Sequence, residues 1–139
     1  MKVALVGSRF FGASVLEALR QVPGVQIGCV VTIAADDRLA LAAQKAGIPV
    51  HIQENPKTVS GDAIAAGTDV IIAAHTHARI SDEALAKSRL GGVGYHPSLL
   101  PRHRGIAAVE WTILSGDPIA GGSVYHLADG WDKGGMTSP

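Results

Sequence analysis

The sequence predicts a single α/β domain built on a doubly wound, mostly parallel β-sheet. Short apolar runs alternate with stretches of helical periodicity, which is the pattern of repeated βαβ units. The run at residues 69–74 has a continuous apolar centre, as expected for a strand that is covered on both faces. With 139 residues, 47% of them hydrophobic and 17% charged, the chain is long enough for one domain with its own core.

Each predicted strand is an apolar segment bounded by glycine, proline or polar residues. The predicted strands are residues 3–6, 25–32, 49–52, 69–74, 92–96 and 122–127, and we expect the last of these to be the final strand. Ligands of such sheets bind outside the carboxyl ends of the parallel strands. The loops that follow Val6, Ile72 and Tyr95 should therefore open on one edge.

The predicted helices lie between these strands, at residues 11–22, 36–46, 81–89 and 106–114. In the first helix Val15, Leu19 and Val22 recur at spacings of four and three, and a Pro-Gly pair ends it. In the third, Ser81 is the expected N-cap. Residues 53–67 give a weaker pattern, polar at first and then typical of a short helix.

Composition excludes several classes of protein. Lys plus Arg equals Asp plus Glu at 12 each, so the chain lacks the basic excess of a broad nucleic-acid surface. Cys29, the single cysteine, excludes an internal disulfide, and its apolar neighbours predict a buried, inert thiol. No stretch approaches the roughly 18 apolar residues of a membrane span or the apolar region of a signal peptide. We expect a soluble, cytoplasmic protein.

The segment 7–12 (GSRFFG) predicts a tight turn from a strand into a helix. Ser8 stands where the dinucleotide fingerprint has its second glycine, and no Lys-Ser or Lys-Thr follows Gly12, so neither that fingerprint nor a P-loop is present. The free amides of the helix N-terminus could still hold an anion. We favour a plain strand-to-helix turn over ligand contact for this segment.

His96 lies at the predicted carboxyl end of a strand, and Pro97 and Pro101 stiffen the loop that follows. Because an imidazole ordinarily titrates near neutral pH, His96 is a candidate general acid or base. A structural histidine that bonds to a loop carbonyl would give the same pattern. From the residue alone the two interpretations are equal.

The segment 96–105 (HPSLLPRHRG) resembles the signature loop of the formyltransferase family. A second marker of the family, Asp-x-Gly after a later strand, is matched by Asp132-Lys133-Gly134. Within the family the likeness is greatest to the formyl-hydrolase domain of 10-formyltetrahydrofolate dehydrogenases, whose opening is also similar to Phe10-Phe11-Gly12. The resemblance covers nearly the whole chain and implies the formyltransferase fold, a Rossmann-like sheet.

The resemblance also implies a reaction, in which the formyl group of 10-formyltetrahydrofolate passes to an amine, or to water in the hydrolase branch. His96 matches the family's catalytic histidine and Asp132 its catalytic aspartate. An ionised Asp132 beside His96 would favour the imidazolium form, which can donate to the oxyanion that develops on the formyl oxygen. The positions expected on the folate side are Ala74, His75, Thr76, His77, Tyr95, Ser98, Leu99 and Arg104.

Other interpretations accompany some of these residues. His75 and His77 form a His-x-His pair, which can ligate a metal ion. Because the sequence offers no third ligand nearby, we favour a loop beside the pterin and predict no metal site. Arg104 could be a solvated loop charge, but the resemblance makes it either a structural residue or a contact of the substrate. Tyr125 and His126 are expected to be packing or surface residues of a strand.

Two features depart from the family. The transferases have an asparagine two residues before the histidine, where this chain has Gly94, and the loss of one oxyanion donor typically costs ~2.7–4 kcal/mol of transition-state stabilisation. The hydrolase branch also lacks this asparagine.

The chain also stops at Pro139, before the family's closing strand and helix, which would leave the Asp132 loop without an anchor on its far side. A partner subunit (for example in a homo-oligomer), a truncation or a decayed gene would explain that end.

These departures leave a second function open, a weak or inactive remnant of the same fold that binds folate or a nucleotide. An NAD-binding domain is a third interpretation. The missing fingerprint counts against it, as does the lack of an acidic residue closing the second predicted strand.

Overall fold

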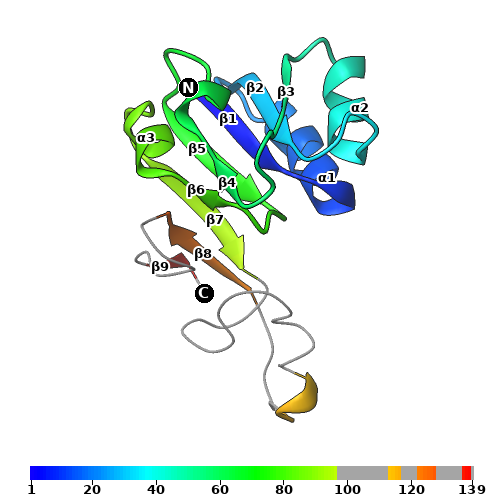
Figure 1. Cartoon of the computed structure of the whole chain (residues 1–139), viewed down its shortest axis with the longest axis vertical. Coiled ribbons are helices and arrows are strands. Elements are labelled where there is room, and N and C mark those ends of the chain that lie inside the picture. Colours follow the sequence, from blue (N-terminus) through cyan, green and yellow to red (C-terminus); the bar gives the residue numbers. More distant parts are fainter. Residues whose placement is uncertain (97–112, 117–121, 128–135, 139) are drawn as a thin grey trace.

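The computed structural model describes residues 1–96, 113–116, 122–127 and 136–138. A seven-stranded sheet in the order β3-β2-β1-β5-β7-β8-β9 runs through the molecule (Figure 1). Its strands are β1 (Lys2–Gly7), β2 (Gln26–Thr32), β3 (Val50–Ile52), β5 (Val70–Ala74), β7 (Gly92–His96), β8 (Ser123–His126) and β9 (Met136–Ser138). The strands from β3 to β7 pair in parallel, and β8 and β9 add antiparallel pairs at one side. The predicted doubly wound, mostly parallel sheet is confirmed.

Both faces of the parallel part are covered (Figure 1). Helices α1 (Arg9–Arg20) and α2 (Arg38–Lys45) pack against each other on one face. The other face carries the 3-10 helix η1 (Gly61–Ala63), α3 (Asp82–Ala86) and a small parallel sheet of β4 (Thr58–Val59) and β6 (Arg79–Ile80). We call these two sides the α1 face and the α3 face.

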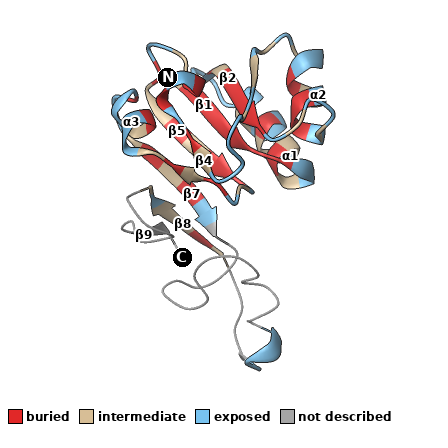
Figure 2. Ribbon diagram, in the orientation of Figure 1, coloured by how far each residue is buried: buried red, intermediate tan, exposed pale blue. Residues whose placement is uncertain are grey.

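The alternation of β1 explains the two hydrophobic clusters. Leu5 packs on the α1 face with Leu16 and Leu39, whereas Ala4 and Val6 point to the α3 face. All five of these residues are 0% exposed, and Figure 2 shows the central strands largely in the red of buried residues. A strand covered on both faces must be apolar at every position, which is why the central strands read as continuous apolar runs.

Cys29 belongs to the cluster on the α3 face and is 5% exposed, so the prediction of a buried thiol is confirmed. Burial raises the pKa of this thiol above its ordinary value, because the surroundings disfavour the thiolate. The nearby Ala65 backbone and Lys2 charge act in the opposite direction and do not outweigh burial.

Most predicted elements are present within about two residues of their expected bounds. Strands β4 and β6 are not among the predicted elements, because a two-residue strand is too short to show alternation. Helix α3 ends at Ala86 rather than at Arg89. The hydroxyl of Ser88 lies 2.7 Å from the carbonyl of Leu85 and 2.9 Å from that of Gly91 and shares its one proton between them, so the chain after α3 is bonded as a turn. Of the predicted helix 106–114, residues 106–112 lie outside the described residues.

The prediction that residues 122–127 form the last strand is wrong. Strand β9 pairs with β8 through Tyr125 opposite Met136 and Val124 opposite Ser138. A three-residue Met-Thr-Ser segment carries no apolar pattern, so only the pairing reveals it. A paired strand therefore follows Asp132 as well as precedes it, contrary to the expectation that no strand lies beyond it; Asp132 itself lies outside the described residues.

Candidate active site

The carboxyl ends of β1, β5 and β7 lie side by side at one edge of the sheet. Gly7 is opposite Ala74 in the β1–β5 pair, and Ala73 is opposite Gly94 in the β5–β7 pair. The chain turns from β1 toward β2 in one direction and from β5 toward β7 in the other, so this edge contains the topological switch point. Such a point is where ligands of doubly wound sheets bind. The expectation that these loops share an edge is confirmed.

Ser8 joins the loop after β1 to the loop after β5. Its hydroxyl donates to the carbonyl of His75 at 2.8 Å, and its backbone N–H donates to the carbonyl of Ala74 at 3.3 Å. Ser8 is 5% exposed, so these bonds are shielded from water. This role of Ser8 is not predictable from the sequence pattern. A small hydroxyl residue directly after a strand-ending glycine was its only signal.

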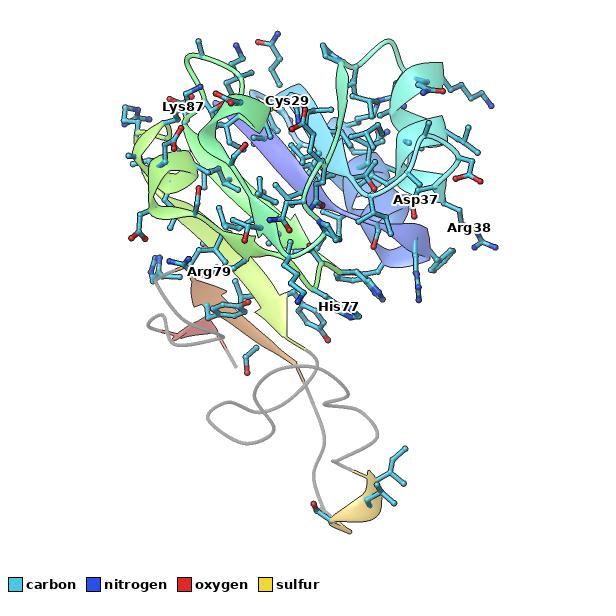
Figure 3. All side chains as sticks on the ribbon, in the orientation of Figure 1. Cys29, Asp37, Arg38, His77, Arg79 and Lys87 are labelled. Atoms are coloured by element: carbon cyan, nitrogen blue, oxygen red, sulfur yellow. The ribbon has the colours of Figure 1, made fainter. Side chains whose placement is uncertain are left out.

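Asp37 adds a third segment to this framework. Its carboxylate accepts from the backbone N–H of Leu39 at 2.9 Å, which caps α2, and from the N–H of Arg9 at 2.9 and 3.1 Å. Figure 3 shows Asp37 beside the start of α1. The anion that meets the first amide of α1 is therefore a carboxylate of the protein itself. At this amide, the segment 7–12 is therefore better explained as a strand-to-helix turn than as a site for a ligand anion.

The loop after β5 presents two stacked imidazoles. The rings of His75 and His77 lie 5.8 Å apart at 28°, and both residues are exposed, with His77 at the edge of the sheet in Figure 3. His75 has a φ of 60°, a left-handed conformation that is uncommon for a residue other than glycine. The hydroxyl of Thr76 accepts from the N–H of Ala78 at 3.0 Å and closes the turn.

The pKa of His75 lies below its ordinary value of 6.5. Partial loss of hydration is the main cause, and the Arg9 and His77 charges add to it, while Asp37 acts in the opposite direction. The shift favours the neutral imidazole, which can accept one hydrogen bond and donate another. Within the described part of the chain no three His, Cys, Asp or Glu side chains form a group that could hold a metal ion.

Tyr95 lies on the α1 face of β7, where its ring contacts Phe11. The ring centroids are 5.1 Å apart at a tilt of 39°. Tyr95 is 42% exposed and the neighbouring Phe10 is 69% exposed. This corner of the carboxyl edge thus offers apolar ring surface to a ligand.

His96 is the last residue of β7, and its backbone is opposite Ser123 of β8. The strand thus ends where the sequence analysis predicts. Of the other predicted site residues, Ala74, His75, Thr76, His77 and Tyr95 gather at the same edge. Ser98, Leu99, Arg104 and Asp132 lie outside the described residues, so their proximity to His96 stays a prediction.

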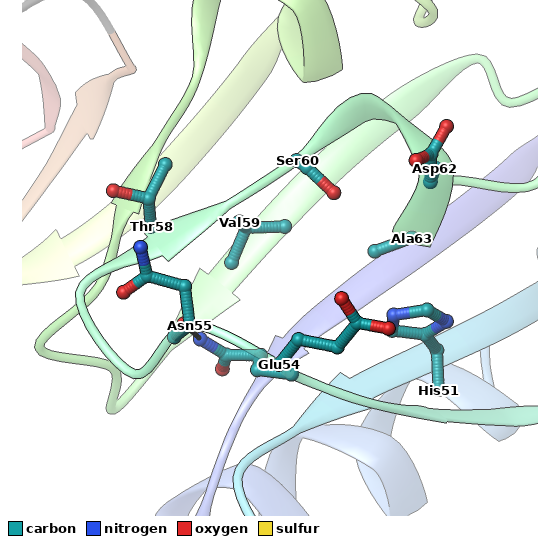
Figure 4. A pocket seen from close by; sticks show the side chains of 9 residues that line it. His51, Glu54, Asn55, Thr58, Val59, Ser60, Asp62 and Ala63 are labelled. Atoms are coloured by element: carbon teal, nitrogen blue, oxygen red, sulfur yellow. Dashed lines mark hydrogen bonds between the residues drawn. The ribbon is translucent and has the colours of Figure 1, made fainter.

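A pocket of about 200 Å³ lies on another part of the described chain, between β3 and the β4–η1 segment (Figure 4). The residues that line it are His51, Gln53, Glu54, Asn55, Thr58, Val59, Ser60, Asp62 and Ala63. Strand β3 is four strands away from β7 in the sheet, roughly 19 Å at the usual spacing. The pocket is therefore separate from the edge that carries His96.

Comparison with known proteins now decides the family, because the family model described as formyl transferase matches residues 1–138. The chain belongs to the formyl transferase family. It is 33% identical over 147 aligned residues to cytosolic 10-formyltetrahydrofolate dehydrogenase of Homo sapiens, with 98% of this chain and 16% of that protein covered. It is 36% identical over 146 residues to the mitochondrial enzyme of Homo sapiens, with 96% and 16% covered. The chain thus spans about a sixth of the length of these curated relatives.

Solved structures agree on the fold. The phosphoribosylglycinamide formyltransferase from Bacillus halodurans superposes with a TM-score of 0.79 at 20% identity, covering 98% of this chain and 76% of that one. The likeness to a formyl transferase inferred from the loop 96–105 is confirmed. In this formyl transferase family member, none of the helices in the described ranges has the length and apolarity to cross a membrane.

Proposed function

We propose that this family member takes the formyl group from 10-formyltetrahydrofolate and passes it to water or to an amine. One observation carries the proposal. His96 ends β7 at the carboxyl edge, directly beside the switch point between β1 and β5, in a chain that matches the formyl transferase family along residues 1–138.

The reaction sets the requirements of the site. The oxygen of water, or an amine nitrogen, adds to the formyl carbon, and the C=O π electrons move onto the formyl oxygen. When they return, the bond from carbon to the folate nitrogen N10 breaks. The proton lost by the attacking group goes to N10, which gives tetrahydrofolate and formate or a formylated amine. The site must therefore donate to the oxyanion and carry one proton to N10.

We assign both tasks to His96 and Asp132. An aspartate beside the imidazole favours its protonated form, which donates to the oxyanion and can then give a proton. The chain can bring the two together. Leu127 bonds to Gly92, four residues before His96, a distance of ~13 Å along β7, and the five residues from Leu127 to Asp132 can span up to ~17 Å.

Gly94 supports water as the acceptor, because the resemblance implies an asparagine at this position in the transferases and none in the hydrolase branch. It equally motivates the alternative, a folate-binding remnant with little or no turnover. A folate would lie along the edge formed by residues 74–77 and Tyr95, with Ser98, Leu99 and Arg104 contributing from the loop. No metal ion is needed for this chemistry, and a cytoplasmic location stays a prediction.

The test is formyl release from 10-formyltetrahydrofolate, followed through the appearance of tetrahydrofolate and of formate. We expect turnover by the chain and a loss of roughly 10²-fold or more in both His96→Ala and Asp132→Asn. Unchanged turnover in both variants would remove the site assignment. Measurable folate binding without any turnover would instead support the remnant.

A further inference from the structure

On the α3 face of β7, a side chain of the neighbouring strand fills the space beside a glycine. Gly94 is buried, and a Cβ atom built on it would lie 2.9 Å from both Cζ and the hydroxyl oxygen of Tyr125, and 3.1 Å from Cε1. The three nearest atoms are thus all at the hydroxyl end of one ring. The volume that a side chain at position 94 would fill is taken by the tip of Tyr125.

The register of the sheet explains how this ring arrives there. Tyr125 is directly opposite Gly94 in the antiparallel β7–β8 pair, and Ser123 is opposite His96. Opposed residues of a ladder project to the same face, so Tyr125 and position 94 share one face. Leu127 and Leu85 both lie near Gly92, which identifies it as the α3 face.

Position 96 lies two residues beyond Gly94, and alternate residues of a strand project to the same side. The two Cα atoms are therefore roughly 7 Å apart along β7. A phenol hydroxyl over Gly94 is thus one side-chain length from the end of β7. A longer side chain at position 94 would displace the ring, so the glycine is a condition of this arrangement.

We propose that the Tyr125 hydroxyl is a second donor to the oxyanion of the formyl reaction, placed over Gly94 in the space that a donor side chain at 94 would occupy. This inference rests on the proposed function. The phenol O–H keeps its proton throughout and forms a hydrogen bond that strengthens as charge develops on the formyl oxygen. No bond is made or broken at Tyr125.

This role differs from packing, and Tyr125→Phe separates the two. The variant keeps the ring that fills the space over Gly94 and removes only the hydroxyl. Loss of a donor that acts mainly in the transition state lowers kcat and leaves KM nearly unchanged. We expect kcat for formyl release to fall roughly 10²-fold, with KM for 10-formyltetrahydrofolate within about twofold of the wild-type value.

A second variant moves the donor to the other strand. In Gly94→Asn/Tyr125→Ala the ring is absent, so an asparagine side chain has room at position 94. We expect this double variant to exceed Tyr125→Ala alone in kcat by about tenfold or more. His126→Gln is the matched control, an exposed neighbour on the same strand that faces the other side, and its kcat should stay within about twofold of wild type.

The outcomes separate the two proposals. If the wild-type chain releases formyl and Tyr125→Phe does so with an equal kcat, the assignment of Tyr125 is wrong and the proposed function stands. If the wild-type chain releases no formyl, the proposed function is overturned and the role of Tyr125 falls with it. A parallel loss of kcat and of the free energy of unfolding in Tyr125→Phe would also overturn the donor role, since it would assign the hydroxyl to structure.

Discussion

Gly7→Ala is the substitution that tests the framework of the site most severely. A Cβ at Gly7 would lie 2.1 Å from the carbonyl oxygen of Ala74 and 3.0 Å from its carbonyl carbon. Both atoms are backbone of the neighbouring strand, so no side chain can rotate away. To reach an ordinary contact, the ends of β1 and β5 would have to separate by about 1 Å.

The cost follows from what that separation breaks. Overpacking of a closed site costs about 1–3 kcal/mol. The two bonds from Ser8 to Ala74 and His75, at 3.3 and 2.8 Å, would lengthen beyond useful range, at about 0.5–1.5 kcal/mol each. We therefore expect the free energy of unfolding to fall by about 2–6 kcal/mol. Because a misplacement of about 1 Å can cost ~10²-fold in rate, formyl release should also fall strongly.

Urea denaturation of the variant and of Gly24→Ala gives the comparison. Gly24 has a φ of +81°, and a Cβ added there would meet nothing within 4 Å, so alanine costs only the left-handed backbone, about 1 kcal/mol. If Gly7→Ala destabilises the chain no more than Gly24→Ala does, the close approach of β1 and β5 is not what holds this edge.

Two further substitutions probe the same edge. Asp37→Ala removes the cap of α2 and the acceptor of the Arg9 amide, so urea denaturation should show a fall of about 1.5–3 kcal/mol in the free energy of unfolding. Asp37→Ser keeps a capping side chain and should lose less stability. Equal losses in the two variants would contradict the capping role. His75→Asn tests the lowered pKa of His75. Because the pKa is lowered on folding, the folded state binds fewer protons than the unfolded state below pH 6.5. The free energy of unfolding of the wild type should therefore fall relative to that of His75→Asn as the pH falls below 6.5. If the difference between the two free energies stays constant from about pH 7.5 to about pH 5, the shift is refuted.

The elements that the sequence predicts correctly are those with a long apolar pattern. The central strands are apolar at every position because both faces are buried, and Val3 to Val6 show this directly. The sequence does not predict elements that are defined by strand pairing alone. Neither β4 nor β9 exceeds three residues, and β9 is recognised only because Met136 and Ser138 lie opposite residues of β8. Helix α3 is shorter than expected because Ser88 leaves the helix through its own hydroxyl bonds, which composition does not reveal.

The site shows the same division. The position of His96 at a strand end and the sharing of one edge by three loops follow from the chain order of a doubly wound sheet. The roles of Ser8 and Asp37 depend on contacts across 67 and 28 residues of sequence, respectively. Tyr125 was expected to be a packing or surface residue, and its place over Gly94 follows from the β7–β8 register, which the sequence does not determine.

The proposed reaction depends above all on His96 and Asp132 acting as one unit. The direct measurement is a double-mutant cycle in kcat/KM for formyl release, with His96→Ala, Asp132→Asn and the double variant. Residues that act together are strongly non-additive, so we expect the double variant to be no more than about threefold worse than the more damaging single variant. If the two losses multiply instead, the residues act independently and the pair does not exist.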